Sequence, residues 1–280
     1  MTNAKRTVRT GLPKLVASDL DGTLVRSDDT VSEYTRSVIQ RVRAAGIPVV
    51  GATGRGPRLA DLTRADIGDV DYLVLGGGGR VLDLTDPAKP EVLRDARLDG
   101  AVLRDLLERI EARVGPLSVL VEALDTPSAP LWGDPNPEWR YPDIVEQMPR
   151  HRALAGAIIK GFARTADYDV DVLLAAAREV VPPELATVTQ AGLGYVEICP
   201  PLVDKATGLA VIAERIGVDP QDVLVFGDMP NDIPMFEWAG FGRVAMAGAH
   251  PALRAVADEV TLSNDEDGVA VYLDRLLSAS

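Results

Sequence analysis

Short apolar runs alternate with helix-like segments over the first third of this 280-residue chain. Lys14–Ser18, Ile47–Gly51 and Asp71–Leu75 are each apolar and short enough to be strands. Between them lie a segment over 30–46, with apolar residues at helical spacing, and a second over Pro57–Arg64. Strands joined by helices imply a parallel sheet that is covered on both faces.

This rhythm changes after about residue 85 and resumes near residue 200. Asp86–Pro90 is polar and contains two prolines, so we expect it to be a linker. In the middle of the chain, strands and helices do not alternate one for one, which is typical of an α+β arrangement. We therefore predict an α/β fold in which residues 1–85 and 200–280 form a Rossmann-like parallel sheet core. An α+β insertion would occupy residues 86–199.

Two of the predicted helices begin at recognisable capping residues. Thr30-Val31-Ser32-Glu33 has the form of a capping box, which predicts Thr30 as the N-cap with Glu33 reaching back. Asp204 is a candidate N-cap for a helix that ends before Gly217.

The composition restricts the classes of partner. A formal net charge of −13 and a pI of about 4.7 argue against nucleic-acid binding, which needs clustered Lys and Arg. No apolar stretch approaches the length of a membrane span. The single cysteine, Cys199, excludes an internal disulfide and fits a reducing cytoplasm. With two histidines and abundant carboxylates, the available ligands favour Mg²⁺ over softer metals.

The first predicted strand is followed directly by Asp19-Leu20-Asp21-Gly22-Thr23. The two carboxylates are two positions apart, and side chains with this spacing point the same way from an extended chain. Like charges so close repel each other unless a cation neutralises them. The pair therefore predicts a divalent metal site in which one carboxylate is free to attack an electrophile.

Polar groups suited to metal or phosphate also follow the other core strands or begin the next helix. They are Thr53 with Gly54 and Arg55, Lys205, and Asp228 with Asn231 and Asp232. Ligands of such sheets bind at the carboxyl ends of the strands, so we expect these groups to converge. Each also has a purely structural interpretation, as a turn residue, a solvated lysine or a helix N-cap. Their joint occurrence, in this order, favours a shared site.

In this order and spacing, these segments resemble the four motifs of the haloacid dehalogenase superfamily of phosphatases. Asp19–Thr23, Thr53, Lys205 and Gly227–Asp232 carry the resemblance. The long gap between the second and third motifs is similar to that of the Cof-type branch, which has a type IIB cap inserted there. The resemblance implies that residues 86–199 are a cap that selects the substrate.

The resemblance also implies a role for each group. Asp19 would be the nucleophile that takes the phosphoryl group, and Asp21 the acid and base that serves the leaving alcohol and then water. The implied phosphate-binding residues are Thr53, Gly54, Arg55, Lys205 and Asn231. The implied Mg²⁺ ligands are Asp19, Asp21 through its backbone carbonyl, Asp228 and Asp232.

The implied function is that of a cytoplasmic Mg²⁺-dependent phosphatase acting through an aspartyl-phosphate, as a monomer or homodimer. Small phosphorylated metabolites would be its substrates: sugar phosphates, or flavin or nucleotide monophosphates. One alternative is a phosphomutase of phosphorylated sugars, since the same nucleophile serves both reactions. A second is a non-catalytic metabolite-binding regulatory protein, although the presence of both Asp19 and Asp21 argues against it.

Two features bear on substrate contacts. Gly76–Gly79 stand where many Cof-type proteins have an Asn-Gly turn, and permit either close backbone approach or a flexible turn. Within the insertion, aromatic and basic side chains offer contacts to a ring or a second anion, but packing and solvated surface are the simpler interpretations. These residues are Trp132, Trp139, Tyr141, Tyr195, Arg140, Arg150, Arg152, Lys160 and Arg164.

Overall fold

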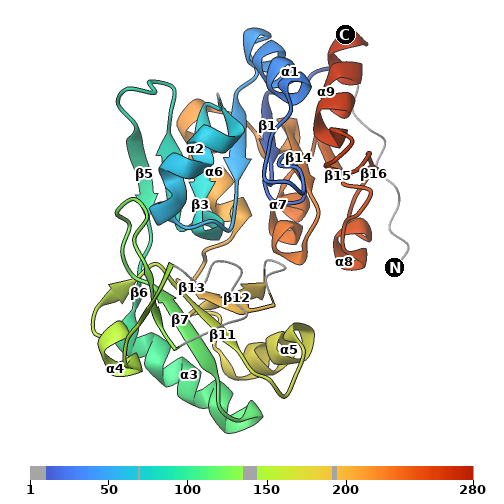
Figure 1. Cartoon of the computed structure of the whole chain (residues 1–280). Helices are drawn as coiled ribbons and strands as arrows, with labels where there is room; N and C mark the ends of the chain where they lie inside the picture. The colour runs from blue at the N-terminus through green and yellow to red at the C-terminus, as the bar shows by residue number, and fades with distance from the viewer. Residues whose placement is uncertain (1–10, 69, 135–143, 191–193, 280) are drawn as a thin grey trace.

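The computed structural model describes residues 11–68, 70–134, 144–190 and 194–279. An eight-stranded sheet forms the core, in the order β16-β15-β14-β1-β2-β3-β4-β5 (Figure 1). Its strands are β1 (Leu15–Ser18), β2 (Val49–Ala52), β3 (Tyr72–Leu75), β4 (Arg80–Asp83), β5 (Glu91–Asp95), β14 (Val223–Gly227), β15 (Gly242–Ala245) and β16 (Glu259–Val260). The six strands from β16 to β3 are parallel, as the alternation of strands and helices predicts.

Helices cover both faces of this sheet. One face carries α1 (Glu33–Ala44), α2 (Ala60–Ile67) and α9 (Gly268–Ser278). The opposite face carries α6 (Lys205–Ile216), α7 (Ile233–Trp238) and α8 (Pro251–Arg254). The buried strand residues alternate between these two apolar layers, since successive side chains of a strand point to opposite faces. No helix in the described ranges is both long and apolar enough to cross a membrane.

The linker expected at Asp86–Pro90 is wrong. It connects β4 to β5, which pair antiparallel with each other, and β4 pairs antiparallel with β3. The core sheet therefore extends to Asp95, beyond the predicted boundary at residue 85. The sequence suggested a linker because polar, proline-bearing composition is equally typical of a hairpin connection.

A six-stranded, largely antiparallel sheet lies between β5 and α6 in the chain, and we call the part from β6 to β13 the cap. Its strand order is β12-β13-β11-β7-β8-β9. The strands are β7 (Ser118–Glu122), β8 (Leu131–Gly133), β9 (Val145–Gln147), β11 (Lys160–Arg164), β12 (Thr187–Gln190) and β13 (Val196–Cys199). The short strands β6 (Leu98–Asp99) and β10 (Ala157–Ile158) form a separate pair.

The cap sheet has one face covered by helices and another that turns toward the core (Figure 1). Helices α3 (Gly100–Val114) and α5 (Val170–Val180) pack on the first face, and α4 (Arg150–Ala153) lies beside β8. The α+β character predicted for the middle of the chain is confirmed.

One predicted helix cap is confirmed and the other is wrong. Asp204 caps α6 and accepts a hydrogen bond from the Thr207 amide, with the reciprocal bond also present. Helix α1 instead begins after Ser32, whose hydroxyl accepts from the Thr35 amide. Thr30 belongs to the preceding turn instead, where its amide and hydroxyl both donate to Asp28.

Candidate active site

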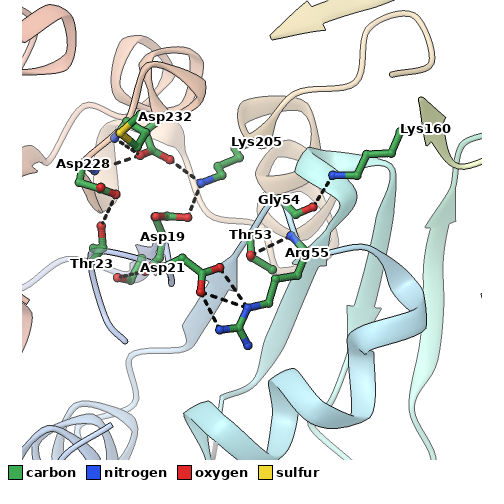
Figure 2. Close-up of polar contacts among 12 residues, drawn as sticks. Asp19, Asp21, Thr23, Thr53, Gly54, Arg55, Lys160, Lys205, Asp228 and Asp232 are labelled. Carbon is green, nitrogen blue, oxygen red and sulfur yellow. Dashed lines mark hydrogen bonds and ion pairs between the residues drawn. The ribbon is translucent and has the colours of Figure 1, made fainter. Parts of the chain in front are cut away.

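Three neighbouring strands end at the same edge of the core sheet. Asp19 follows β1, Asp228 follows β14 on one side of it, and Thr53 follows β2 on the other (Figure 2). Because parallel strands present their carboxyl ends together, Asp19 and Asp228, which are 209 residues apart in sequence, become neighbours. Lys205 enters the same space as the first residue of α6. The convergence predicted from the sequence is therefore present.

Lys205 is the cation at the centre of this site. Its Nζ lies 2.5 Å from Oδ1 of Asp19 and 2.5 Å from Oδ1 of Asp232, and its side chain is fully buried (Figure 2). Burial alone lowers the pKa of a lysine, but Asp19 and Asp232 reverse that effect and raise the pKa of Lys205. Lys205 is therefore a permanent ammonium that fixes one oxygen of Asp19.

Asp19, Asp228 and Asp232 form an acidic cluster whose ligand atoms all lie within 4.8 Å of one another. Burial raises the pKa of Asp19 well above its usual value, and Asp232 and Asp228 add to the effect, against the opposing charge of Lys205. Burial and Asp232 raise the pKa of Asp228 in the same way. One ammonium among three carboxylates leaves negative charge in excess, so a divalent cation fits this cluster.

Asp232 uses both carboxylate oxygens on the protein itself. Oδ1 accepts from Lys205, and Oδ2 accepts from the backbone amides of Asp228 and Met229 at 3.0 Å each. It therefore shapes the loop that presents Asp228. Beside it, Oδ1 of Asn231 is buried and has no hydrogen-bond partner among the described residues, so it is available to a ligand.

The turn after Asp21 brings the first and fourth motifs into contact. Gly22 has a φ of +86°, and a Cβ at this position would lie 2.5 Å from Oδ2 of Asp228. Only glycine combines this backbone conformation with such close approach. The next residue, Thr23, donates from its hydroxyl to Oδ1 of Asp228 at 3.0 Å. Thr23 thus orients the Asp228 carboxylate, a role that the sequence did not reveal.

Asp21 lies outside the acidic cluster and is paired with Arg55. The Arg55 guanidinium donates to both Asp21 oxygens, at 2.6 Å for the shortest contact, and also to Asp66 at 2.7 Å (Figure 2). The Asp21 side chain is 49% exposed and remains accessible at the edge of the site. Arg55 therefore fixes the position of Asp21. Asp66 in turn holds Arg55, a contact that the sequence did not indicate.

Thr53 is fully buried and has a defined hydrogen-bonding state. Its Oγ1 accepts from the Arg55 amide at 3.0 Å, which leaves its hydroxyl proton available to another acceptor. Behind it, the Gly77 amide donates to the Thr53 carbonyl at 2.9 Å. A Cβ on Gly78 would lie 2.0 Å from the Asp204 carbonyl oxygen. The glycine run thus allows close backbone approach, the first of the two interpretations.

The cap aromatics and Cys199 are explained by packing where the structure describes them. Tyr195 meets Phe162 edge to face at 6.5 Å and belongs to an apolar cluster of the cap sheet. Trp132 is partly buried against the other cap cluster. Cys199 is buried, and burial raises its pKa to about 12, which leaves it an unreactive thiol. Trp139, Arg140 and Tyr141 lie outside the described residues.

Lys160 departs from the sequence prediction of a solvated side chain. It is 2% exposed, and its Nζ donates at 2.6 Å to Oε1 of Glu197 and at 2.6 Å to the Gly54 carbonyl. An Ile-Ile-Lys-Gly-Phe segment offered one signal, a lone charge inside an apolar strand. Its partners lie on another strand and in a core loop, so the sequence around Lys160 could not have predicted them.

The geometry agrees with comparisons to known proteins. The sequence profile of the haloacid dehalogenase-like hydrolases matches residues 16–273. The 5-amino-6-(5-phospho-D-ribitylamino)uracil phosphatase YwtE of Bacillus subtilis is 30% identical over 285 residues, covering 95% of this chain and 98% of that protein.

Solved structures show the same architecture. A haloacid dehalogenase-like hydrolase from Bacteroides thetaiotaomicron has a TM-score of 0.72 at 26% identity, covering 94% of this chain and 99% of that one. The sugar phosphatase BT4131, described as subclass IIB of the same superfamily, has a TM-score of 0.77 at 18% identity, covering 95% and 100%. The second of these supports the fold alone.

Proposed function

The chain belongs to the haloacid dehalogenase-like hydrolases, and from this premise we propose that it is a Mg²⁺-dependent phosphatase of small phosphorylated metabolites. The buried ion pair between Lys205 and Asp19, beside the carboxylate of Asp228, is the observation that carries the proposal. It supplies an oriented carboxylate, a fixed cation and a place for a metal in one small volume. Phosphoryl transfer depends chiefly on such positioning and charge neutralisation.

Asp19 and Asp228 are the side chains that would hold Mg²⁺ directly. Asp232, the third expected ligand, already accepts from Lys205 and from two backbone amides, so it is the weakest candidate of the three. By resemblance, the backbone carbonyl of Asp21 would join them. When bound, Mg²⁺ would neutralise the acidic cluster and the charge on the phosphoryl oxygens. Asp232 would act as a positioning residue for Lys205 and for the loop of Asp228.

In the first half-reaction, a carboxylate oxygen of Asp19 forms a bond to phosphorus as the bond to the leaving oxygen breaks. Lys205 holds Asp19 and balances the charge of the phosphoryl group. The Thr53 hydroxyl and the Gly54 amide would donate to phosphoryl oxygens, with Asn231 beside them. The product is an aspartyl-phosphate on Asp19 and a free alcohol.

Asp21 would give its proton to the leaving alcohol. In the second half-reaction it would take a proton from the water that attacks phosphorus, and the bond from phosphorus to Asp19 breaks. Arg55 holds Asp21 at the exposed edge of the site, where both the alcohol and water have access.

The first substrate to test is the one named for the relative YwtE, 5-amino-6-(5-phospho-D-ribitylamino)uracil. It combines a phosphorylated polyol with a planar ring, and so lies between the sugar phosphates and the flavin and nucleotide monophosphates expected from the sequence. The similarity extends over the cap as well as the core, since 95% of this chain is matched. The role of the cap in substrate selection, the cytoplasmic location and the monomer or homodimer state remain predictions.

A phosphate-release assay with Mg²⁺ tests the proposal. The panel would contain this ribitylaminouracil phosphate, hexose phosphates, FMN and nucleotide monophosphates, with Asp19→Asn as the inactive control. Release from at least one metabolite by wild type alone is the expected result. Conversion of a hexose 1-phosphate to its isomer without release would favour the phosphomutase instead, and no turnover of any member would overturn the proposal.

A further inference from the structure

Lys160 is a cap lysine whose ammonium reaches the catalytic loop of the core. Its exposed fraction is 2%, and Figure 2 shows its Nζ directed at the Gly54 carbonyl. Two buried carboxylates of the cap compensate its charge: Glu197 at 2.6 Å, and Glu122, which is its cross-strand neighbour on β7. A buried ammonium is costly unless carboxylates neutralise it, and here two carboxylates of the cap hold Lys160 against the core.

The Thr53–Gly56 loop is held by its carbonyl groups. The carbonyls of Thr53 and Arg55 accept from the Gly77 and Gly76 amides at 2.9 and 2.8 Å, and that of Gly56 accepts from the Leu59 amide at 2.9 Å. All three of these donors belong to the core. Among the described residues, the Gly54 carbonyl is the one of these four loop carbonyls that accepts from the cap, and its donor is Lys160.

The Gly54 carbonyl shares a peptide plane with the amide of Arg55. Because that plane is rigid, a donor that fixes the carbonyl also fixes the direction of the N–H. The Arg55 N–H donates to Oγ1 of Thr53 at 3.0 Å, and that bond leaves the Thr53 hydroxyl proton as the donor for phosphate. A continuous path therefore runs from Lys160 through one peptide plane to Thr53.

We propose that Lys160 is a positioning residue of the active site, which orients the Thr53 hydroxyl when the cap is docked on the core. The inference rests on the proposed function, in which Thr53 contacts the phosphoryl group. It has a specific consequence: turnover of a substrate too small to need the cap still depends on this cap residue. A lysine that only balances Glu197 and Glu122 would have no such effect.

The test separates hydrogen bonding from charge. Lys160→Met alone would leave Glu197 without its counter-ion, so both test variants carry Glu197→Gln. K160Q/E197Q and K160M/E197Q are matched in charge and similar in size, but only glutamine can donate to the Gly54 carbonyl. The substrate is p-nitrophenyl phosphate, with kcat and KM measured with Mg²⁺, and circular dichroism and thermal unfolding confirm the fold of each variant.

We expect K160M/E197Q to lose about 10- to 100-fold in kcat/KM, and K160Q/E197Q to recover part of that loss. Adding Thr53→Ala to each should abolish the difference between them, because the effect acts through Thr53. Equal kcat/KM values for the two variants, or a difference that survives in the Thr53→Ala background, would overturn the inference.

Glu197→Gln alone keeps the donor and tests the inference even if the double variants do not fold. It should stay within about 2-fold of wild type in kcat/KM, since the bond from Lys160 to Gly54 remains. A 10-fold loss would show that the ion pair, and not the bond to Gly54, is what matters. A wild type that releases no p-nitrophenol would instead count against the proposed function.

Discussion

Lys205 and Asp19 form a buried 2.5 Å ion pair, which joins two segments that are 186 residues apart. Burial and the carboxylates of Asp232 and Asp228 raise the pKa of Asp19, so a nearby cation is needed to keep this carboxylate ionised. An isolated carboxylic acid in such a place would hold its proton and be a poor nucleophile. Lys205, and a metal when bound, favour the ionised form that the proposed reaction needs.

Asp19→Asn should abolish turnover while leaving the fold intact. The amide cannot form the covalent intermediate, so kcat should fall by about 10⁴-fold or more. Removing one of three adjacent carboxylates also relieves repulsion, so without Mg²⁺ the melting temperature should not decrease. Phosphate release and thermal unfolding measure the two effects. Substantial remaining phosphatase activity would refute Asp19 as the nucleophile.

Asp228→Asn should weaken Mg²⁺ binding by about 10-fold or more, because the neutral amide is a poorer ligand for a hard cation. The readout is the rise in melting temperature on titration with Mg²⁺, which follows from preferential binding to the folded state. EDTA should remove this rise in wild type. Asp105→Asn, on the exposed side of α3, is the control for a general loss of charge and should leave the titration unchanged. Equal titrations for Asp228→Asn and wild type would contradict the metal assignment.

Glu122→Gln should stabilise the protein increasingly as the pH rises. Burial raises the pKa of Glu122 above its usual 4.5, against the opposing charges of Lys160 and Arg58. The folded state therefore binds this proton more tightly than the unfolded chain. Its contribution to stability is complete below pH 4.5 and is lost as the pH rises through the folded pKa.

Glutamine does not titrate, so the difference in melting temperature between Glu122→Gln and wild type should grow from about pH 4.5 toward neutrality. Glu146→Gln, on the exposed strand β9, is the matched control and should show a flat difference. A flat or decreasing profile for Glu122→Gln would mean that its ion pairs outweigh its burial.

Leu202→Gly should raise stability by about 1 kcal/mol, equivalent to about 2 °C in melting temperature. Leu202 has a φ of +57° and is 74% exposed, so its side chain strains the backbone and buries little in return. Leu202→Ala keeps the Cβ that causes the strain and should show no gain. The comparison of the two by thermal unfolding isolates the backbone effect, and equal stabilities would disprove it.

Much of the core could be predicted because short apolar runs and the turn residues after them are visible in the local sequence. Apolar runs with turn residues after them identified β1, β2 and β3, and the parallel pairing of the core strands places Asp19, Thr53 and Asp228 at one edge. The α1 cap was wrong because two candidates, Thr30 and Ser32, stand two residues apart, and a side chain of the preceding turn captured the first.

The contacts that could not be predicted are those between distant segments. Asp66 is an ordinary helical residue in the sequence, and only the fold makes it a partner of Arg55. Lys160 looks like a surface cation until two carboxylates from other positions of the cap sheet surround it. Composition also cannot separate a linker from a hairpin connection, so Asp86–Pro90 was misassigned.

The chain passes between the two sheets twice, after β5 and after β13, and the second passage delivers Lys205 at once. The Arg94 guanidinium donates to the Leu202 carbonyl at 3.1 Å, and this bond connects β5 to the segment that returns to the core. Leu202 lies three residues before Lys205, so this bond fixes the return segment close to the ion pair with Asp19. The short segment that joins the two sheets therefore also carries the ammonium that pairs with Asp19.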